Sequence, residues 1–467
     1  MNRVLIFLLG LIVLCTAGCS LAPTYARPEA PVPAAWPGAA GREADKPGEI
    51  AADVSWKDFI LDEKLRQVIG LALSNNRNLR VAALNVERTQ ALYRIQRAEL
   101  LPAVNAGATF SKERVPGILS QSGQPKTTEL YNVNLGVSAW EIDLFGRIRN
   151  LSDAALEQYF ATEQARASAQ IALVAEVANT WLALAADREN LKLARSTLET
   201  QLQTYEMIRR RAEVGASSDL DLRQAQTRVD AARVDIARYT SQVALDENAL
   251  ALLVGSPVPQ ELLPDALSDV KAPRDFTPGL PSEVLQRRPD IVAAEHQLRA
   301  AHANIGAARA AFFPRITLTT SIGTTSDQLS GLFTSGSETW SFVPRIVVPI
   351  FDARTWAAYD VTKVDREIAL AQYEKAIQTG FREVADTLAQ RATLWDQLEA
   401  QQSLVEASEV SYRLSDARYT KGIDSYLRVL DAQRSLYSAQ QGLIAVRLAR
   451  LANLVTLYKV LGGGGDS

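Results

Sequence analysis

The chain has 467 residues, of which 47% are apolar and 22% are charged, and its formal net charge is −3. This balance is typical of a folded protein and provides no strongly basic surface, so nucleic acid is excluded as an expected partner. At roughly 150 residues per domain, the length allows two to four ordinary domains.

The N-terminus has the pattern of an export signal. Arg3 precedes an apolar core at 4–14 and a small-residue cleavage region, "TAGC". The core is too short for a transmembrane helix, which needs about 20 residues. We therefore predict a lipoprotein signal peptide at 1–18.

Cys19 directly follows the predicted signal peptide. "AGCS" resembles a bacterial lipobox, in which this cysteine is acylated, although Thr16 stands where an aliphatic residue is usual. Ser20 resembles an outer-membrane sorting signal. The alternative is ordinary cleavage that leaves a free thiol. Because Cys19 is the only cysteine after residue 18, no disulfide is expected within the mature chain.

The first half of the chain predicts a helix, a β-hairpin and two long helices. Residues 102–141 alternate small or apolar with polar residues on either side of a loop rich in glycine, proline and serine. No proline occurs from Lys126 to Ser256, and Gly215 is the only glycine between Asn150 and Val254, which indicates very long helices. After an N-terminal linker at 19–56, the first repeat (57–255) is predicted to hold a hairpin at 102–141 and helices at 57–101, 152–213 and 219–254.

The long helices also carry a seven-residue apolar repeat, which is typical of a coiled-coil seam. The alternative is a set of surface helices on a compact core, and the helix lengths argue against it. The repeating positions are Val177, Leu184, Leu191, Leu198 and Tyr205, then Leu222, Val229, Ile236, Val243 and Leu250.

The second half repeats this organisation after a proline-rich linker at 256–281. The stretch "VGASSDLDLRQAQTRV" aligns without a gap with the stretch that begins "KGIDSYLRVLDAQRS", so that Gly215 falls on Gly422. The second repeat (282–461) is predicted to hold a hairpin at 314–351 and helices at 282–313, 354–420 and 425–461, followed by a tail at 462–467. Both linkers are expected to wrap the middle of the structure.

Four predicted strands are too few to close a membrane barrel. Single-chain barrels have at least about 8 strands, and open strand edges are not tolerated in lipid. Strands of about ten residues have the length of a tilted membrane strand. If they span a bilayer, several chains must share one barrel.

Residues 57–461 resemble the outer-membrane efflux proteins of the TolC type, most closely the OprM-like lipoprotein subgroup. The resemblance is carried by "AWEIDLFGRIRN", "RRPDIVAAEHQLRAAHANIGAARAAFFP", "YLRVLDAQRSLYSAQQ" and "LYKVLGGG". It implies a mixed α/β membrane protein, mostly α. Three chains would form a twelve-stranded outer-membrane β-barrel, with four strands per chain, that continues into a long periplasmic coiled-coil α-barrel.

The resemblance implies an exit duct of a tripartite efflux pump that passes drugs or other small amphiphilic compounds. The implied partners are two further copies in a homotrimer, a periplasmic adaptor, an inner-membrane resistance–nodulation–division pump and outer-membrane lipid. It also implies a lipid-anchored location in the outer membrane with a large periplasmic portion. The alternatives are a duct for another cargo (metal ions or type I secretion) and a non-conducting periplasmic coiled-coil lipoprotein.

An enzyme is not expected. His296 and His302 are six residues apart on a predicted helix and so on different faces, and Cys19 is the only cysteine of the mature chain. No metal, cofactor or catalytic constellation is therefore predicted. Methionine is limited to Met207 after the signal, so soft-metal handling is unsupported.

A periplasmic gate is expected near the second helix–helix turn. Asp431 and Arg434 are predicted to lie on the same helix face as Leu427 and Leu430, within an apolar seam. The resemblance matches Leu427 and Asp431 to constricting positions, with Arg434 as charge partner. The alternative is an intrahelical ion pair without further role. In the first repeat, Asp221 aligns with Arg428, and both are added to the predicted gate.

The two predicted turns are expected to form the tips that meet the adaptor. Glycine permits a close backbone approach of a partner, although it would also serve simply as a helix cap. The residues of these tips are Val214, Gly215, Ala216 and Ser217 in the first repeat and Lys421, Gly422, Ile423 and Asp424 in the second.

Overall fold

The structure, a computed structural model, describes residues 20–37, 54–120, 123–275 and 282–463. The predicted signal peptide and Cys19 lie outside the described residues. The chain divides into two compact units. Among the described residues, unit 1 comprises 20–29, 85–120, 123–162 and 293–373, and unit 2 comprises 30–37, 54–84, 163–275, 282–292 and 374–463.

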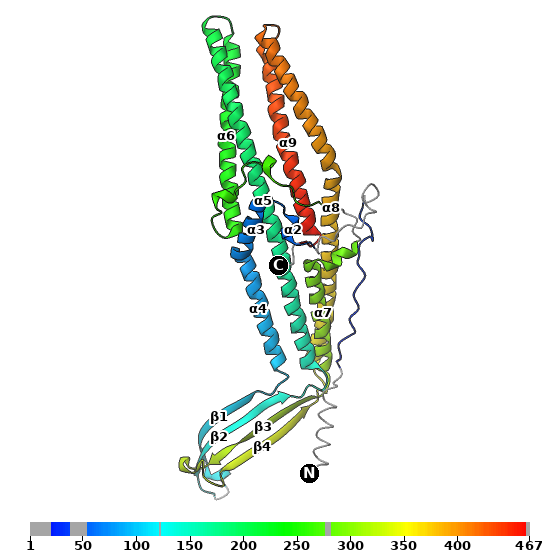
Figure 1. The fold of residues 1–467 in the computed structure, drawn as a ribbon. Coiled ribbons are helices and arrows are strands. Elements are labelled where there is room, and N and C mark those ends of the chain that lie inside the picture. Colours follow the sequence, from blue (N-terminus) through cyan, green and yellow to red (C-terminus); the bar gives the residue numbers. More distant parts are fainter. Residues whose placement is uncertain (1–19, 38–53, 121–122, 276–281, 464–467) are drawn as a thin grey trace. The chain divides into compact units, whose positions relative to one another are not determined.

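Long helices dominate both repeats. Helix α5 (Arg147–Glu213) is followed by α6 (Asp219–Val254), and α8 (Ala353–Thr420) is followed by α9 (Tyr426–Val460) (Figure 1). Helix α5 begins five residues before the predicted start. Gly146, which has a φ of 77° that favours glycine, precedes it. The positions of the seven-residue repeat are buried or half-buried in α5 and α6, as a packed seam requires.

The prediction of one helix at 57–101 is wrong. The segment forms α2 (Trp56–Phe59), α3 (Glu63–Asn75) and α4 (Arg77–Ala98). Asn76 has an extended backbone (φ −61°, ψ 126°) and separates the last two. Its Oδ1 accepts a hydrogen bond from the Leu79 backbone N–H at 2.9 Å, so Asn76 caps α4 instead of continuing α3.

The prediction of one α-helix at 282–313 is also wrong. A 3₁₀ helix, η5 (Ser282–Arg287), precedes α7 (Pro289–Ala310). Pro289 is the first residue of α7, a position that suits proline because no backbone N–H is needed there. Proline disfavours the α conformation of the residue before it, which is why the helix does not run through Arg288.

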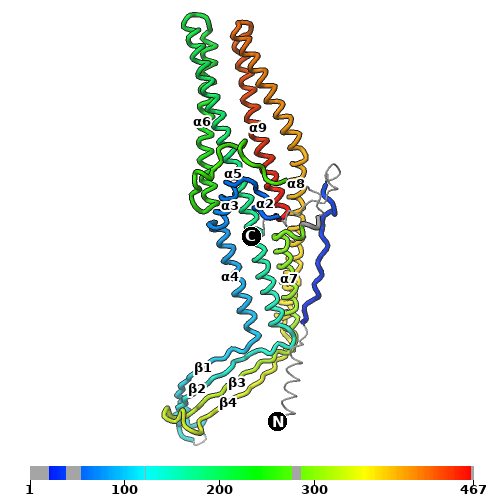
Figure 2. The backbone as a smooth tube through the Cα atoms, viewed as in Figure 1, coloured from blue at the N-terminus to red at the C-terminus, as the bar shows by residue number. Residues whose placement is uncertain are grey.

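The two hairpins form one antiparallel sheet in unit 1, in the order β1-β2-β3-β4 (Figure 2). The register pairs Ala106 with Leu135, Leu135 with Ile322, and Ile322 with Trp340. The strands are β1 (Val104–Val115), β2 (Lys126–Glu141), β3 (Arg315–Ser326) and β4 (Glu338–Val347). All four lie within the predicted hairpin regions, and β1 and β4 form the edges of the described sheet.

The sheet has one apolar and one polar face. Because side chains alternate along each strand, the register places most large apolar residues on one face. That face includes Val104, Ala106, Phe110, Val133, Leu135, Val137, Leu318, Ile322, Trp340, Phe342 and Ile346. The opposite face carries polar contacts, such as Ser321 Oγ with Ser341 Oγ at 2.8 Å and Asn132 Nδ2 with Thr325 Oγ1 at 2.8 Å.

Aromatic side chains form part of the core of unit 2. Phe59 stacks on Tyr458 with ring centroids 4.0 Å apart, and Trp36 stacks on Phe381 at 4.7 Å. Trp181 of α5 is fully buried, and its Nε1 donates to the Leu262 carbonyl at 3.0 Å. One window of α5 is apolar and long enough to cross a membrane, but 67% of it is buried, as in the core helix of a packed bundle.

Candidate gate, docking tips and N-terminal anchor

The structure corrects the predicted placement of the gate residues. Leu430 is 2% exposed and packs inside unit 2, whereas Leu427 is 53% exposed. The side chains of Asp431 and Arg434 are 55% and 65% exposed. At 3.6 residues per turn, Leu427 and Leu430 differ by about 60° around the helix, enough to put one in the seam and the other outside it.

Leu427, Asp431 and Arg434 therefore form an exposed stripe on α9. Arg434 Nη2 lies 3.4 Å from Asp431 Oδ1, so the intrahelical ion pair forms within one chain. The gate role of these residues stays a prediction.

The buried side of α9 joins both helical hairpins of the chain within unit 2. Tyr426, Val429 and Leu430 pack with Ile208 of α5 and Ala225 of α6 in one apolar cluster. The Tyr426 hydroxyl is buried and has no hydrogen-bond partner among the described residues. Burial raises the pKa of Tyr426, so this hydroxyl stays neutral.

A polar ladder continues this contact between α6 and α9. Tyr437 Oη donates to Asp235 Oδ2 at 3.0 Å, and Gln441 Nε2 donates to Tyr239 Oη at 2.9 Å. Arg238 Nη2 lies 3.0 Å from Asp235 Oδ1. The two residues of each helix are four positions apart in sequence, Asp235 and Tyr239 on α6 and Tyr437 and Gln441 on α9. Successive turns of α6 therefore bond to successive turns of α9.

Asp221 is placed by the start of α6. Its Oδ2 accepts hydrogen bonds from Ser217 Oγ and the Ser218 backbone N–H, both at 3.2 Å, and the Ser218 side chain accepts from the Asp221 backbone N–H at 3.1 Å. This capping box satisfies backbone donors that α6 leaves free. Arg428 is exposed on α9 and makes no ion pair among the described residues.

Both predicted tips have the same backbone geometry. Gly215 has a φ of 73° and Gly422 a φ of 70°. The Gly215 N–H bonds to the Ala212 carbonyl at 2.9 Å, and the Ala216 N–H bonds to the Arg211 carbonyl at 2.7 Å. The second tip repeats these two bonds from Gly422 to Tyr419 and from Ile423 to Arg418, each at 2.9 Å. This pair of bonds is the Schellman motif, which ends α5 and α8.

The side chains of the two tips differ although their backbones match. Val214 is 78% exposed in the first tip, and Ile423 is 58% exposed in the second. Only the second tip carries charge at its centre: Lys421 is exposed, and Asp424 Oδ2 accepts from Arg418 Nε at 2.6 Å. A Cβ added at either glycine would meet no atom within 4 Å.

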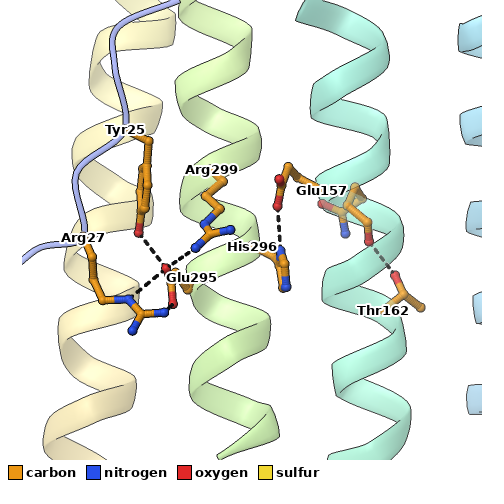
Figure 3. Close-up of polar contacts among 8 residues, drawn as sticks. Tyr25, Arg27, Glu157, Thr162, Glu295, His296 and Arg299 are labelled. Atoms are coloured by element: carbon orange, nitrogen blue, oxygen red, sulfur yellow. Dashed lines mark hydrogen bonds and ion pairs between the residues drawn. The ribbon is translucent and has the colours of Figure 1, made fainter. Parts of the chain in front are cut away.

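The segment that follows Cys19 is held firmly against α7 in unit 1. Glu295, whose side chain is 4% exposed, accepts from Tyr25 Oη at 3.1 Å, Arg27 Nη2 at 2.7 Å and Arg299 Nη2 at 2.7 Å (Figure 3). Ser20 Oγ donates to Asn150 Oδ1 at 2.8 Å. The described chain is thus fixed from the first residue after Cys19.

Close packing supports the same contact. A Cβ on Gly306 would lie 2.7 Å from the Ala22 backbone nitrogen, so only glycine leaves room for the segment there. On α7, His296 Nδ1 contacts Glu157 Oε2 of α5 at 2.6 Å (Figure 3). His302 packs edge-on against Tyr25. Both histidines therefore pack within unit 1, and among the described residues no group of three potential ligands could hold a metal ion.

The comparisons with known proteins agree with this geometry. The profile of the family described as "Outer membrane efflux protein" matches residues 68–256 and 280–463. The chain belongs to this family. Its two matched segments leave the linker between the repeats uncovered, as the internal duplication requires.

Relatives within the family cover nearly the whole chain. The antibiotic efflux pump outer membrane protein ArpC and the toluene efflux pump outer membrane protein TtgC, both of Pseudomonas putida, are each 50% identical over 449 residues, which is 96% of this chain and 93% of theirs. The open state of the Neisseria gonorrhoeae MtrE outer membrane channel is 38% identical with a TM-score of 0.84, and covers 96% of this chain and 98% of that chain.

Family membership confirms the predicted fold class, the function as an outer-membrane efflux channel and the location in the outer membrane. Neither the α6–α9 ladder nor the cluster around Glu295 was predicted from the sequence. A carboxylate in the alanine-rich stretch "VAAEHQLRAA" was a usable signal for the second, because small residues allow a chain segment to approach closely.

Proposed function

We propose that three copies of this chain form the exit duct of a tripartite efflux pump. The two-faced sheet with its edges at β1 and β4 carries this proposal. In a bilayer the edges require partners, and three copies supply twelve strands in one closed barrel. The apolar face would then contact lipid, and the polar face would line the water-filled interior.

The proposed cargo is a small amphiphilic compound. The relatives at 50% identity are named for efflux of antibiotics and of toluene, which are small organic compounds. The proposed partners are a periplasmic adaptor and an inner-membrane resistance–nodulation–division pump. No contact in the described residues favours a metal ion or a secreted protein as cargo.

The proposed gate is the exposed stripe of Leu427, Asp431 and Arg434. In a trimer the stripe recurs three times around one axis, with Arg428 next to Leu427 on α9 and Asp221 at the start of α6. Solvated ion pairs contribute about 0.2–1 kcal/mol each. If Asp431 and Arg434 pair between chains in the closed state, three copies would supply about 0.6–3 kcal/mol, which shifts a closed–open equilibrium roughly 3–150-fold. An adaptor that docks can supply that much free energy.

The proposed docking surfaces are the two tips, 214–217 and 421–424. Their Schellman turns hold the exposed apolar side chains of Val214 and Ile423 at fixed positions. Among the described residues nothing covers the glycines, so a partner backbone can approach them closely.

Single-channel conductance of the purified trimer in planar bilayers tests the gate. We expect Asp431→Ala and Arg434→Ala to raise basal conductance without loss of trimer, and Leu427→Ala to add to either. Asp230→Asn is a matched control, because Asp230 forms an i,i+3 pair with Arg233 at 3.1 Å elsewhere on α6. Conductance equal to wild type in all three variants would refute the gate and would leave Asp431 and Arg434 as an intrahelical ion pair without further role.

The proposed lipid anchor is an acyl group on Cys19. Two or three acyl chains, at ~0.8 kcal/mol per buried methylene, would hold the N-terminus in the membrane. Mass spectrometry of the mature N-terminal peptide distinguishes this from a free thiol, and an unmodified Cys19 would refute the anchor while leaving the duct proposal intact.

A further inference from the structure

A cavity in unit 1 opens between the N-terminal segment and helices α7 and α8. Its volume is about 540 Å³, within the ~300–1,000 Å³ range of small-molecule sites. Buried Ile305 of α7 and half-buried Pro23 of the segment line its apolar part. Three cations and two carboxylates line the rest, which leaves an excess of one positive charge. These charged residues are Arg309 of α7 and Asp360, Lys363, Arg366 and Glu367 of α8.

Arg309 is the cation of this lining that lacks a carboxylate partner. The other two each pair with a carboxylate of α8. Arg309 instead donates from Nη1 to the Leu21 carbonyl at 3.2 Å and from Nε to Tyr359 Oη at 3.4 Å, and it forms no ion pair among the described residues. A guanidinium has five N–H donors and matches the geometry of a phosphate, so Arg309 retains donors for an anion.

Tyr359 holds a second cation next to Arg309. The Arg309 guanidinium carbon lies 5.9 Å from the centroid of the Tyr359 ring, and Lys363 Nζ lies 4.8 Å from the same centroid. The ion pair of Lys363 with Asp360 is largely solvated, with side chains 51% and 68% exposed. Because a solvated pair contributes little, Lys363 can turn to another anion at small cost.

We propose that this cavity binds the phosphate group of a phospholipid in the periplasmic leaflet of the outer membrane, with Arg309 and Lys363 as its contacts. A headgroup phosphate is anionic and offers several acceptor oxygens, so it can bridge the two cations and offset the excess charge. This inference rests on the proposed function, in which the apolar face of the sheet contacts lipid.

The position of the cavity favours a lipid over a free anion. Arg309 is in the last turn of α7, and β3, which is proposed to span the bilayer, begins at Arg315. Phe312 packs on Trp356 with ring centroids 4.7 Å apart and on Tyr359 at 5.9 Å, and Trp356 is 61% exposed. Exposed aromatic rings are typical of the interface between membrane and water. The aromatic cluster therefore indicates that the cavity lies at the level of lipid headgroups.

The proposed anchor supports the same level. Arg309 binds the carbonyl of Leu21, and Cys19 precedes Leu21 with only Ser20 between them. An acyl group on Cys19 would enter the leaflet whose headgroups face the cavity.

Native mass spectrometry of the purified full-length protein in detergent, titrated with dihexanoyl phosphatidylglycerol, tests the site. This short-chain lipid carries its phosphate next to an uncharged glycerol, so its binding reports on the anion. We expect Arg309→Gln to weaken lipid binding about tenfold, because a charge-assisted hydrogen bond is lost, and Lys363→Gln to weaken it less. Arg354→Gln is the matched control and should bind like the wild type, because Arg354 is 92% exposed, pairs with Asp352 and lies outside the cavity lining.

Two further measurements separate the alternatives. An equal concentration of inorganic phosphate should leave the lipid bound, and displacement would overturn the proposal in favour of a free-anion site. Chymotrypsin digestion after Tyr25 checks that Arg309→Gln keeps the segment attached. Lys363 forms its ion pair within α8, so Lys363→Gln tests the site without that effect.

Absence of lipid binding in the wild type, or unchanged binding in both Arg309→Gln and Lys363→Gln, would overturn the proposal. Failure of the duct proposal would instead appear as absent conductance in planar bilayers, which the binding measurement does not use.

Discussion

The tips place two requirements on Gly215 and Gly422, a positive φ and the absence of a side chain. A suitable substitution separates the two. Both glycines have a positive φ, which costs any residue with a Cβ about 1 kcal/mol, and asparagine tolerates this conformation better than alanine. Gly215→Asn and Gly422→Asn should therefore keep the helix ends and add bulk only on the outer surface. We expect efflux in cells to fall at least tenfold with normal trimer levels.

Gly336 offers a matched control for these variants. It has a φ of 92°, and a Cβ there would also meet no atom within 4 Å, but it lies in the loop between β3 and β4. Gly336→Asn should leave efflux unchanged. Equal loss of efflux in all three variants would assign the effect to general instability, and full efflux in the tip variants would exclude docking at these glycines.

Ala139 is strained at the end of β2. It has a φ of 51°, at a bulge where the register of β2 with β3 shifts between Val137 and Trp140. Ala139→Gly should remove about 1–2 kcal/mol of strain and raise the temperature at which the trimer dissociates. Ala108→Gly, in the regular part of β1, should lower that temperature. A lower temperature for Ala139→Gly would show that its methyl group contributes more than the backbone costs.

Single residues also show what the sequence could and could not predict of the site. Gly215 was predictable as a turn because it interrupts a long run without glycine or proline, and Gly422 because it aligns with Gly215 in the second repeat. The exposure of Leu427 was not predictable. Helical spacing groups residues into faces, but which face a neighbouring helix covers depends on packing between elements far apart in sequence.

At the scale of elements, the α6–α9 ladder is a joint between the two hairpins of one chain. Tyr437→Phe keeps the ring and removes the hydrogen bond to Asp235, which should cost about 1 kcal/mol. We expect faster hydrogen exchange in α9 near residue 437 and a higher open probability of the channel.

Asp235→Asn tests the other half of the joint. An asparagine retains an acceptor for the Tyr437 hydroxyl but loses the ion pair with Arg238. Its effect should be smaller than that of Tyr437→Phe at pH 5 and at pH 8. If both variants exchange like the wild type, the ladder does not restrain α9.

The elements themselves were predicted well where composition was the signal. The absence of proline over long stretches defined α5, α6, α8 and α9 to within a few residues, and α5 and α6 lack glycine as well, because both residues destabilise helix interiors. The breaks at Asn76 and Arg288 were missed. Asn76 looked like an ordinary polar helix residue, and only its contact with Leu253 and its capping of α4 explain the break.

At the scale of the whole molecule, the segment 20–29 depends on the charge of Glu295. Burial opposes ionisation, but hydrogen bonds from Arg27 and Arg299 hold the pKa of Glu295 below its ordinary value. A lowered pKa contributes stability that is present above the ordinary glutamate range and is lost as the pH falls below it. The protection of residues 20–29 against hydrogen exchange, corrected for the intrinsic pH dependence, should therefore fall in acid.

Glu295→Gln should reproduce the acid effect at neutral pH. The partners Arg27 and Arg299 are 46% and 36% exposed, so we expect a loss of about 1–3 kcal/mol in the attachment of the segment. Limited chymotrypsin digestion after Tyr25 measures that attachment, and Asp365→Asn on the exposed side of α8 is the control. Unchanged cleavage in Glu295→Gln would show that Gly306 packing alone holds the segment.

Because Ser20 is hydrogen-bonded to Asn150, no flexible segment separates the proposed acyl group on Cys19 from unit 1. Consecutive Cα atoms are about 3.8 Å apart, so an anchor on Cys19 stays within one residue of a fixed point on unit 1. Such an anchor would fix the distance between unit 1 and the lipid surface, in addition to keeping the protein in the membrane. A spacer of glycine and serine inserted between Cys19 and Ser20 would keep the protein in the membrane, but the distance between unit 1 and the lipid surface would no longer be fixed.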